Sequence, residues 1–464
     1  MAPAPMLNTQ SGGVHLPPAP RSPRPLVALG FVGARRPTIG WLTHRYGPAV
    51  TMRIPVFGDT VMITDPVLAK QVFTASPDVL QNIQPNLSRL LGEGSVFGLE
   101  GAQHRRRRKL LTPPLHGRSI TAYERIVEEE TMREMASWPE GAEFETLEPM
   151  MRITLNVILR TVFGADGAEF QQLRDLLPKW VTLGSRLALF PTPTFGPGKW
   201  GTWARLESYR KTYEALIDAL IARTRQDPYF DDRTDVLTLF LRSAYDDGTA
   251  MTRSEIGDEL LTLLAAGHET TASTLAWAFE RISRHPKVLE RLVAEAAGPG
   301  NAYRQATIFE VQRNRTVIDF AGRDVAVPSY QLGEWSLPQG YSILISLLQL
   351  HNDPNVYPEP ERFDPQRFVD DKPSTYSWVP FGGGTRRCIG AAFANMEMDV
   401  VLRMVLQHFT IRTTTAPGEK WHHRGVAFTP KRGGRLVVYR RASSTGLNSS
   451  GEGVDVRHVL QAGG

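Results

Sequence analysis

Residues 381–390 read Phe-Gly-Gly-Gly-Thr-Arg-Arg-Cys-Ile-Gly, and this stretch decides the fold that the rest of the chain is expected to adopt. It places one cysteine, Cys388, between a glycine-rich loop and the start of an apolar segment with helical spacing. A helix N-terminus and neighbouring arginines favour a thiolate. Glycines let the backbone come close to a flat ligand. A lone cysteine near a turn is more often a buried structural residue, so the loop alone leaves both interpretations open.

The cysteine count and the charge narrow the possible classes of protein. Cys388 is the only cysteine among 464 residues, which excludes intramolecular disulfides and sites built from several thiolates, such as iron–sulfur clusters. The chain carries 53 Lys and Arg against 48 Asp and Glu, and the resulting charge of +5 permits an acidic partner. The longest basic run, residues 105–109, could bind a polyanion, although a solvated helix face is the commoner reason for such a run.

Composition also divides the chain into three parts. Residues 1–25 are rich in Pro and small residues and lack the apolar core of a signal peptide, which predicts a flexible arm. Residues 442–464 predict a disordered tail, and no linker interrupts residues 26–441, so we expect one domain there. No run of roughly 20 apolar residues is present, and we expect a soluble, cytoplasmic protein without a transmembrane segment.

Hydrophobic periodicity predicts a mainly α fold with a minor β region. Residues 50–54 and 60–64 predict a hairpin, and residues 325–327 and 341–345 predict two further strands. Helices are predicted at residues 66–76, 102–112, 119–137, 148–164, 168–183, 202–226, 234–244, 253–284, 286–296, 301–314 and 391–408.

The longest predicted helix, residues 253–284, is apolar nearly all round and should be buried. Its centre reads Ala266-Gly267-His268-Glu269-Thr270-Thr271, which places an acid and hydroxyls in an apolar run. The Thr270 hydroxyl can bond the carbonyl of Ala266 one turn back, loosen the helix and open a groove lined by an acid and an alcohol. A glycine that allows close helix packing is the alternative explanation. His268 lacks the second histidine of a His-Glu-x-x-His zinc motif.

Two further short motifs precede Cys388. Glu310-Val311-Gln312-Arg313 places an acid and an arginine three residues apart, which alone is usually a surface pair. Pro365-Gln366-Arg367-Phe368 follows in the turn-rich stretch between residues 352 and 387.

Taken in this order, the three motifs and the cysteine loop resemble the cytochrome P450 family, soluble bacterial type, over about residues 40–440. The resemblance implies a haem b with Cys388 as the thiolate ligand of its iron, buried below a long central helix. It implies proton delivery to bound O₂ by Glu269 and Thr270. It also implies that Glu310, Arg313 and Arg367 form a buried ion network that holds the cysteine loop. Further cofactor contacts are implied for His104, Arg108, Arg323, Phe381, Arg386 and Gly390.

The same resemblance implies a monooxygenase that inserts one oxygen atom of O₂ into an apolar substrate by hydroxylation or epoxidation. Since the sequence has no nucleotide-binding fingerprint, electrons should come from a ferredoxin-type partner with its reductase. Docking is expected near Arg105, Arg106, Arg387 and Arg403. The substrate pocket is expected to draw on Ala266, Val317 and residues 82–97, 168–185 and 317–320, with Asp319 and Gln84 as candidate polar anchors.

Several alternatives stay open at this stage. A haem-thiolate peroxygenase or a hydroperoxide rearrangement catalyst would use the same fold, although neither needs the acid–alcohol pair. A haem-based sensor and a nucleic-acid binder are weaker alternatives. The chain also departs from the usual family pattern, because the stretch between His285 and Glu310 is short and Phe309 replaces the usual lysine before the motif.

Overall fold

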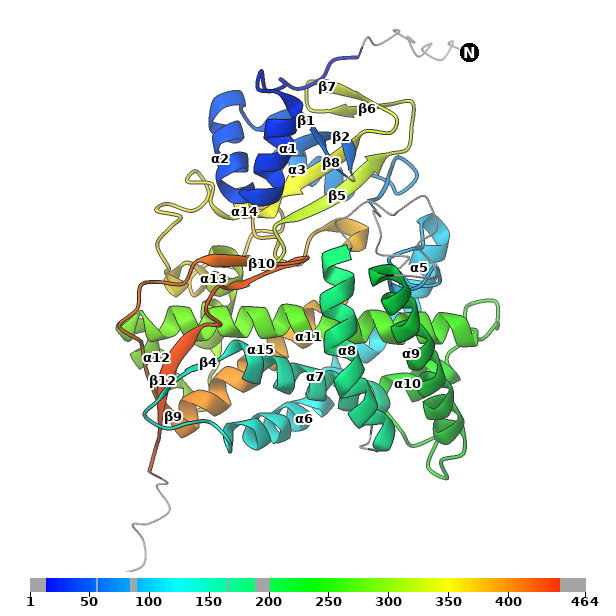
Figure 1. Ribbon diagram of the computed structural model, residues 1–464, viewed down its shortest axis with the longest axis vertical. Helices are drawn as coiled ribbons and strands as arrows, with labels where there is room; N and C mark the ends of the chain where they lie inside the picture. Colours follow the sequence, from blue (N-terminus) through cyan, green and yellow to red (C-terminus); the bar gives the residue numbers. More distant parts are fainter. Residues whose placement is uncertain (1–13, 56, 84–89, 165–166, 188–200, 443–464) are drawn as a thin grey trace, which may run out of the picture.

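The computed structural model describes residues 14–55, 57–83, 90–164, 167–187 and 201–442 (Figure 1). The α-helices are α1 (Arg24–Gly33), α2 (Arg35–Tyr46), α3 (Pro66–Thr74), α5 (Gly101–Leu111), α6 (Arg118–Met135), α7 (Leu147–Phe163), α8 (Ala168–Leu187), α9 (Thr202–Arg225), α10 (Val236–Arg242), α11 (Arg253–Ser283), α12 (Pro286–Ala296), α13 (Ala302–Asn314), α14 (Leu347–His351) and α15 (Ala391–His408). The strands are β1 (Ala49–Ile54), β2 (Gly58–Ile63), β3 (Leu80–Asn82), β4 (Glu143–Glu145), β5 (Phe320–Val325), β6 (Ser329–Leu332), β7 (Trp335–Pro338), β8 (Ser342–Ser346), β9 (Phe409–Arg412), β10 (Trp421–Arg424), β11 (Ala427–Pro430) and β12 (Arg435–Arg440).

Helix α11 crosses the middle of the molecule and organises the helical part (Figure 1). Its 31 residues span about 46 Å. Thr252 and Glu255 form the predicted capping box, in which each side chain accepts a hydrogen bond from the other residue's backbone N–H. Helices α6, α7, α8, α9 and α15 bury their apolar faces in one large core that includes α11. The fold is therefore mainly α, as predicted.

A five-stranded sheet in the order β1-β2-β8-β5-β3 forms a second region. Its side chains alternate between two apolar clusters, as the two-residue period of a strand requires. Val61, Ile63, Ile343 and Ile345 pack towards α3, while Met62 and Leu344 pack towards α1 and α2. The sheet thus carries helices on both faces, and the predicted hairpin of residues 50–64 is confirmed as β1 and β2.

A small sheet and a buried ion pair connect distant parts of the chain. The hairpin β10–β11 lies against α11, where the indole N–H of the fully buried Trp277 donates to the carbonyl of Phe428 (3.2 Å). A buried ion pair joins Arg35 of α2 to Asp319, between α13 and β5 (3.0 Å). These contacts connect segments that lie far apart in the sequence.

Three parts of the expected architecture need correction. Residues 14–25 are not a flexible arm, because the carbonyl groups of His15, Pro17 and Pro18 accept hydrogen bonds from Ser336 and Thr51, and α1 begins at Arg24. Helices α1 and α2 were not predicted, since α1 is apolar on all sides and shows no helical alternation. The strand predicted at residues 325–327 ends at Val325 and begins at Phe320. Residues 1–13 and 443–464 lie outside the described part.

In the described part of the chain, no helix is long and apolar enough to cross a membrane.

Candidate functional site

Cys388 lies between the short 3-10 helix η3 (Gly384–Arg386) and the N-terminus of α15. Its backbone N–H donates to the carbonyl of Phe381 (2.9 Å), which closes the loop. Burial among protein atoms raises the pKa of the thiol, while the Gly390 N–H and the charges of Arg108 and Arg387 lower it. The side chain nevertheless keeps accessible surface. The thiol is therefore surrounded by protein atoms and still accessible.

The loop glycines have two different roles. A Cβ on Gly383 would lie 2.7 Å from the ring of Phe73, and one on Gly384 would lie 1.8 Å from the Phe73 carbonyl oxygen. These two glycines therefore let the loop pack on α3. Gly382 and Gly390 have no other group within 4 Å of a Cβ position, so open space lies beside them. A flat ligand fits beside this second pair.

The centre of α11 carries the predicted acid and alcohol. The Thr270 hydroxyl donates to the carbonyl of Ala266 (2.8 Å), as expected, and α11 stays helical throughout. Ala266 is exposed although most of α11 is buried, so accessible space lies beside this turn of the helix. Gly267 packs on α7, because its Cβ position lies 3.3 Å from Ile158.

Glu269 points away from Ala266, towards the β10–β11 hairpin. Its side chain is buried, with one carboxylate oxygen 3.5 Å from the Arg424 guanidinium and without a hydrogen-bond partner. Burial raises the pKa of Glu269, and the charge of Arg424 opposes that shift. The neighbouring His268 ring bonds the Leu264 carbonyl (2.9 Å) and takes no part in a metal cluster. No group of His, Cys, Asp and Glu side chains suited to a metal ion occurs among the described residues.

The structure brings together the predicted cationic groups His104, Arg108, Arg323 and Arg386. Burial and the surrounding arginines lower the pKa of His104 to about 4, so it is neutral at pH 7. Burial and Arg386 lower the pKa of Arg323 to about 10. Among the described residues one carboxylate, Glu100, pairs with this group, 2.6 Å from Arg386. Three guanidinium groups against one carboxylate leave two positive charges, which suits a ligand with two carboxylates such as haem b.

The basic run of α5 is divided among different partners. Arg107, which was not singled out from the sequence, is buried and pairs with Glu259 (2.8 Å) and with Glu255. Arg106 pairs with Asp247 (2.6 Å), and Lys109 pairs with Asp246 (2.6 Å). Arg105 stays exposed and has no ion-pair partner among the described residues.

An open hollow of about 470 Å³ lies between α5 and the cysteine loop. It is lined by His104, Arg105, Arg108, Lys109, Thr112, Pro113, Gly384 and Thr385. Arg403, predicted to belong to the same docking surface, instead pairs with Glu128 (2.7 Å), and Arg106 pairs with Asp247. The free cations of this surface are therefore fewer than expected.

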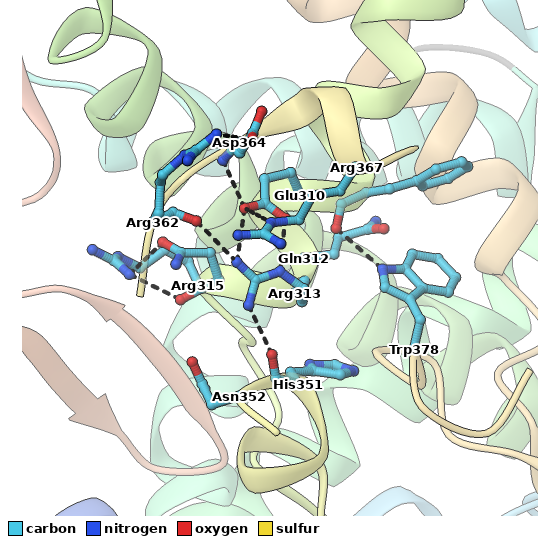
Figure 2. A network of polar contacts seen from close by, with 12 residues as sticks. Glu310, Gln312, Arg313, Arg315, His351, Asn352, Arg362, Asp364, Arg367 and Trp378 are labelled. Carbon is cyan, nitrogen blue, oxygen red and sulfur yellow. Dashed lines mark hydrogen bonds and ion pairs between the residues drawn. The ribbon is translucent and has the colours of Figure 1, made fainter. Parts of the chain in front are cut away.

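The Glu-x-x-Arg motif forms a fully buried ion pair (Figure 2). Two nitrogens of Arg313 donate to the two carboxylate oxygens of Glu310, each at 2.7 Å. The Asp364 backbone N–H also donates to Glu310 (2.8 Å). Arg367 lies 3.8 Å from the same carboxylate and donates to the Glu359 carbonyl (2.9 Å). All three predicted members meet, with Arg367 as the most loosely held.

His351, which was not predicted, connects this pair to the cysteine loop. Its carbonyl accepts a hydrogen bond from Arg313 (2.7 Å), and its Nε2 accepts one from the Val379 backbone N–H (2.9 Å). Val379 precedes the glycine-rich loop and accepts a bond from the Gly382 N–H (2.9 Å). Burial lowers the pKa of His351 to about 3. A lone histidine at the end of a short helix carries no sequence signal of such a role.

The expected substrate pocket is partly misplaced. Asp319 is not an anchor, because it is buried in the ion pair with Arg35. Phe320 packs against Phe57 in the cluster beside α1 and α2. Val317 is buried, and its carbonyl accepts a hydrogen bond from the Phe428 N–H (2.9 Å). Gln84 lies outside the described residues. The sequence also gave no sign of Glu100 as the partner of Arg386.

Comparisons with known proteins agree on one family. Residues 17–436 match the family model described as Cytochrome P450. The "Putative cytochrome P450 138" of Mycobacterium tuberculosis (strain H37Rv) is 62% identical over 428 residues, covering 92% of this chain and 97% of that protein. The "Putative cytochrome P450 135B1" of the same strain is 38% identical over 447 residues, covering 93% of each chain.

Solved structures share the fold at lower identity. A retinoic acid-bound cyanobacterial CYP120A1 superimposes with a TM-score of 0.82 at 23% identity, covering 93% of this chain and 100% of that one. The heme domain of cytochrome P450DA gives a TM-score of 0.78 at 22% identity, covering 92% of this chain and 98% of that one.

Proposed function

Because the chain belongs to the cytochrome P450 family, we propose that Cys388 is the thiolate ligand of its haem iron and that Glu269 and Thr270 deliver protons. The chain is a haem-thiolate monooxygenase that uses haem b. The observation that carries the ligand assignment is the accessible, enclosed thiol of the only cysteine in the sequence. When bound, the haem would supply the iron that binds and activates O₂, and O₂ would be the source of the oxygen atom that enters the substrate.

The protein's own residues hold and tune this group. Cys388 donates electron density as a thiolate, and the Gly390 N–H and Arg108 stabilise its negative charge. His104, Arg108, Arg323 and Arg386 would bind the two haem carboxylates, while Phe381 and Gly390 would lie beside the ring. Glu310, Arg313 and Arg367 fix the loop from behind, which supports a constant orientation of the thiolate.

The proposed proton path runs from Glu269 to Thr270 through water. A carboxyl group with a raised pKa can hold a proton closer to neutral pH than an exposed one, and one oxygen of Glu269 has no fixed hydrogen-bond partner. Thr270 donates its hydroxyl proton to the Ala266 carbonyl, so the lone pairs of its oxygen can accept a hydrogen bond from a water on this path. The raised pKa of Glu269 and the accessible turn at Ala266 support this path.

The substrate is proposed to be an apolar molecule that is hydroxylated or epoxidised. Ala266 has the small, apolar and exposed side chain that such a pocket needs, and Val317 is a weaker candidate because it is buried. A ligand-induced spin-shift screen of apolar compounds tests this part. We further propose that residues 14–442 act as one catalytic unit and that a ferredoxin-type protein with its reductase supplies the electrons.

Replacing Cys388 by Ser tests the ligand assignment. The variant should lose the absorption signature of a thiolate in the reduced CO complex, because no other thiol exists in the chain. Ile389→Val, one residue further along the same loop, should keep that signature. A thiolate signature that survives in Cys388→Ser would contradict the assignment.

Thr270→Ala tests the proton path. The variant should keep its haem and its substrate affinity, but product formed per electron should fall about tenfold while peroxide rises. Thr274→Ala is the matched control, since its hydroxyl makes the same kind of bond, to the Thr270 carbonyl, one turn later (2.9 Å). Unchanged coupling in Thr270→Ala would show that this hydroxyl delivers no proton.

A further inference from the structure

The N-terminal part of the chain has an unusual charge pattern. Residues 1–58 contain six arginines and neither Asp nor Glu, the first acid being Asp59. Two of these arginines are used inside the protein: Arg35 pairs with Asp319, and Arg36 lies 3.8 Å from the ring centroid of Trp421. Three others, Arg21, Arg24 and Arg45, are exposed and have no ion-pair partner in the described part of the chain.

Helix α1 carries an apolar face that no described element covers. After Arg24 it has no polar side chain up to its end at Gly33. Val27 and Phe31 are buried in the cluster beside the sheet. On the opposite side, Leu26, Leu29 and Val32 are 60%, 69% and 61% exposed. A helix that is apolar all round is normally buried on all sides. The outer face of α1 is covered by none of the residues that the structure describes.

The next helix adds an aromatic side chain to the same region. Helices α1 and α2 lie side by side at one end of the molecule (Figure 1), and a Cβ on Gly30 would lie 2.8 Å from the Thr38 hydroxyl. Trp41 of α2 is 48% exposed. Tryptophan is favoured at the boundary between lipid and water, since its ring is apolar and its N–H is polar.

We propose that α1 and Trp41 dock on the surface of a bilayer that contains anionic lipid. An apolar helix face next to cations binds lipid in the plane of the interface, and each basic residue adds attraction to anionic headgroups. The absence of any acid before Asp59 removes the repulsion that would oppose this attraction. The docked protein is bound to one leaflet and does not span it. This surface is independent of the proton path.

Vesicle co-sedimentation of the full-length holoenzyme tests the proposal. Vesicles of phosphatidylcholine with about one-third phosphatidylglycerol should sediment the wild type at low salt, and salt should weaken the binding. Leu26→Ser/Leu29→Ser/Val32→Ser should reduce the bound fraction about fivefold. The matched control is Tyr229→Ser/Val356→Ser, which removes exposed apolar side chains elsewhere and should bind like the wild type.

A second measurement does not depend on the folding of the triple variant. Brominated lipid in the same vesicles should quench the fraction of the wild-type tryptophan fluorescence that comes from Trp41. In Trp41→Phe this quenching should be absent. No sedimentation and no quenching of the wild type would overturn the proposal. The proposal would also be overturned if the triple variant bound vesicles as well as the wild type does. If the only effect of the triple substitution were to change a dimer into a monomer, the face would be assigned to a second copy of the chain instead.

Discussion

At the scale of single residues, His351 shows how a buried group can join two parts of the site. Its Nε2 accepts the Val379 N–H, so the proton of the neutral ring must be on Nδ1, which lies 2.7 Å from the Thr316 hydroxyl. Protonation of Nε2 would break the bond to Val379 and bury a second positive charge near Arg313. Burial of the ring and, to a lesser extent, the charge of Arg313 lower the pKa of His351 to about 3.

The low pKa of His351 predicts a pH-dependent stability. Unfolded, the ring titrates near pH 6.5, so between pH 6.5 and 3 the unfolded state binds more protons and the free energy of unfolding falls as the pH falls. Between pH 6.5 and 5.0 the titration of this residue should lower the free energy of unfolding by about 2 kcal/mol. His351→Gln retains an acceptor for Val379 and does not titrate, so its urea unfolding should depend less on pH by that amount.

The control for this experiment is an exposed histidine. His44→Gln should follow the wild-type pH profile, because His44 lies on the surface of α2. Burial also lowers the pKa values of His104 and His423 to about 4. These two residues reduce the free energy of unfolding at low pH by the same amount in every variant, so their contribution cancels when the variants are compared. Parallel profiles of the wild type and His351→Gln would contradict the role assigned to His351.

The residues of the site were predictable to different degrees. Glu310 and Arg313 could be found because their spacing recurs with the cysteine loop, and the structure places them in contact. Glu100 and His351 could not be found, since a single Glu before a helix and a single His at the end of a helix resemble many surface residues. Their roles depend on contacts across 286 and 28 residues of sequence, respectively.

At the scale of elements, the cysteine loop packs against α3 on one side and has open space on its other side. Gly384 has a φ of +65°, and its Cβ position nearly coincides with the Phe73 carbonyl oxygen of α3. Gly390 has a φ of −82° and an empty Cβ position. The sequence predicted that glycines are needed here but could not tell packing on α3 from contact with a ligand.

This difference predicts opposite effects of two alanine substitutions. Gly384→Ala should destabilise the protein by about 3 kcal/mol even without haem, because both the backbone conformation and the contact with α3 are lost. Gly390→Ala should leave the melting temperature of the haem-free protein unchanged but reduce haem occupancy, if the space beside it belongs to the ring. The readouts are thermal unfolding of the haem-free protein and haem content. A Gly390→Ala variant that loads haem fully would assign that space to something else.

The periodic helices were predicted within a few residues, whereas α1 and α2 were missed. Helices such as α7 alternate apolar and polar faces, and this alternation marks them in the sequence. In α1 both faces are apolar, so no alternation exists. The same property that hides α1 from sequence analysis leaves its outer face available to a lipid surface.

At the scale of the whole molecule, a buried ion pair joins segments that lie far apart in the sequence. Arg35 and Asp319 are 284 residues apart and both buried. Such pairs explain why Asp319 could not be interpreted from sequence, where an acid near a pocket-forming segment suggests a substrate anchor. The basic residues are likewise distributed among buried ion pairs, the group around Arg323, the N-terminal region and the surface near α5.

This distribution sharpens the expected docking surface of an acidic redox protein. Arg105 and Arg106 are neighbours on α5, but Arg106 is paired with Asp247 while Arg105 lines the open hollow beside the cysteine loop. Arg105→Gln should slow reduction by an acidic ferredoxin about threefold at low salt, and salt should remove the difference. Arg106→Gln changes the net charge equally and should have little effect, since the paired charge is not available to a partner. The rate is measured by stopped-flow absorbance, with haem content and thermal unfolding checked in both variants. Equal rates in the two variants, or a wild-type rate that does not depend on salt, would show that this hollow is not where the redox protein docks.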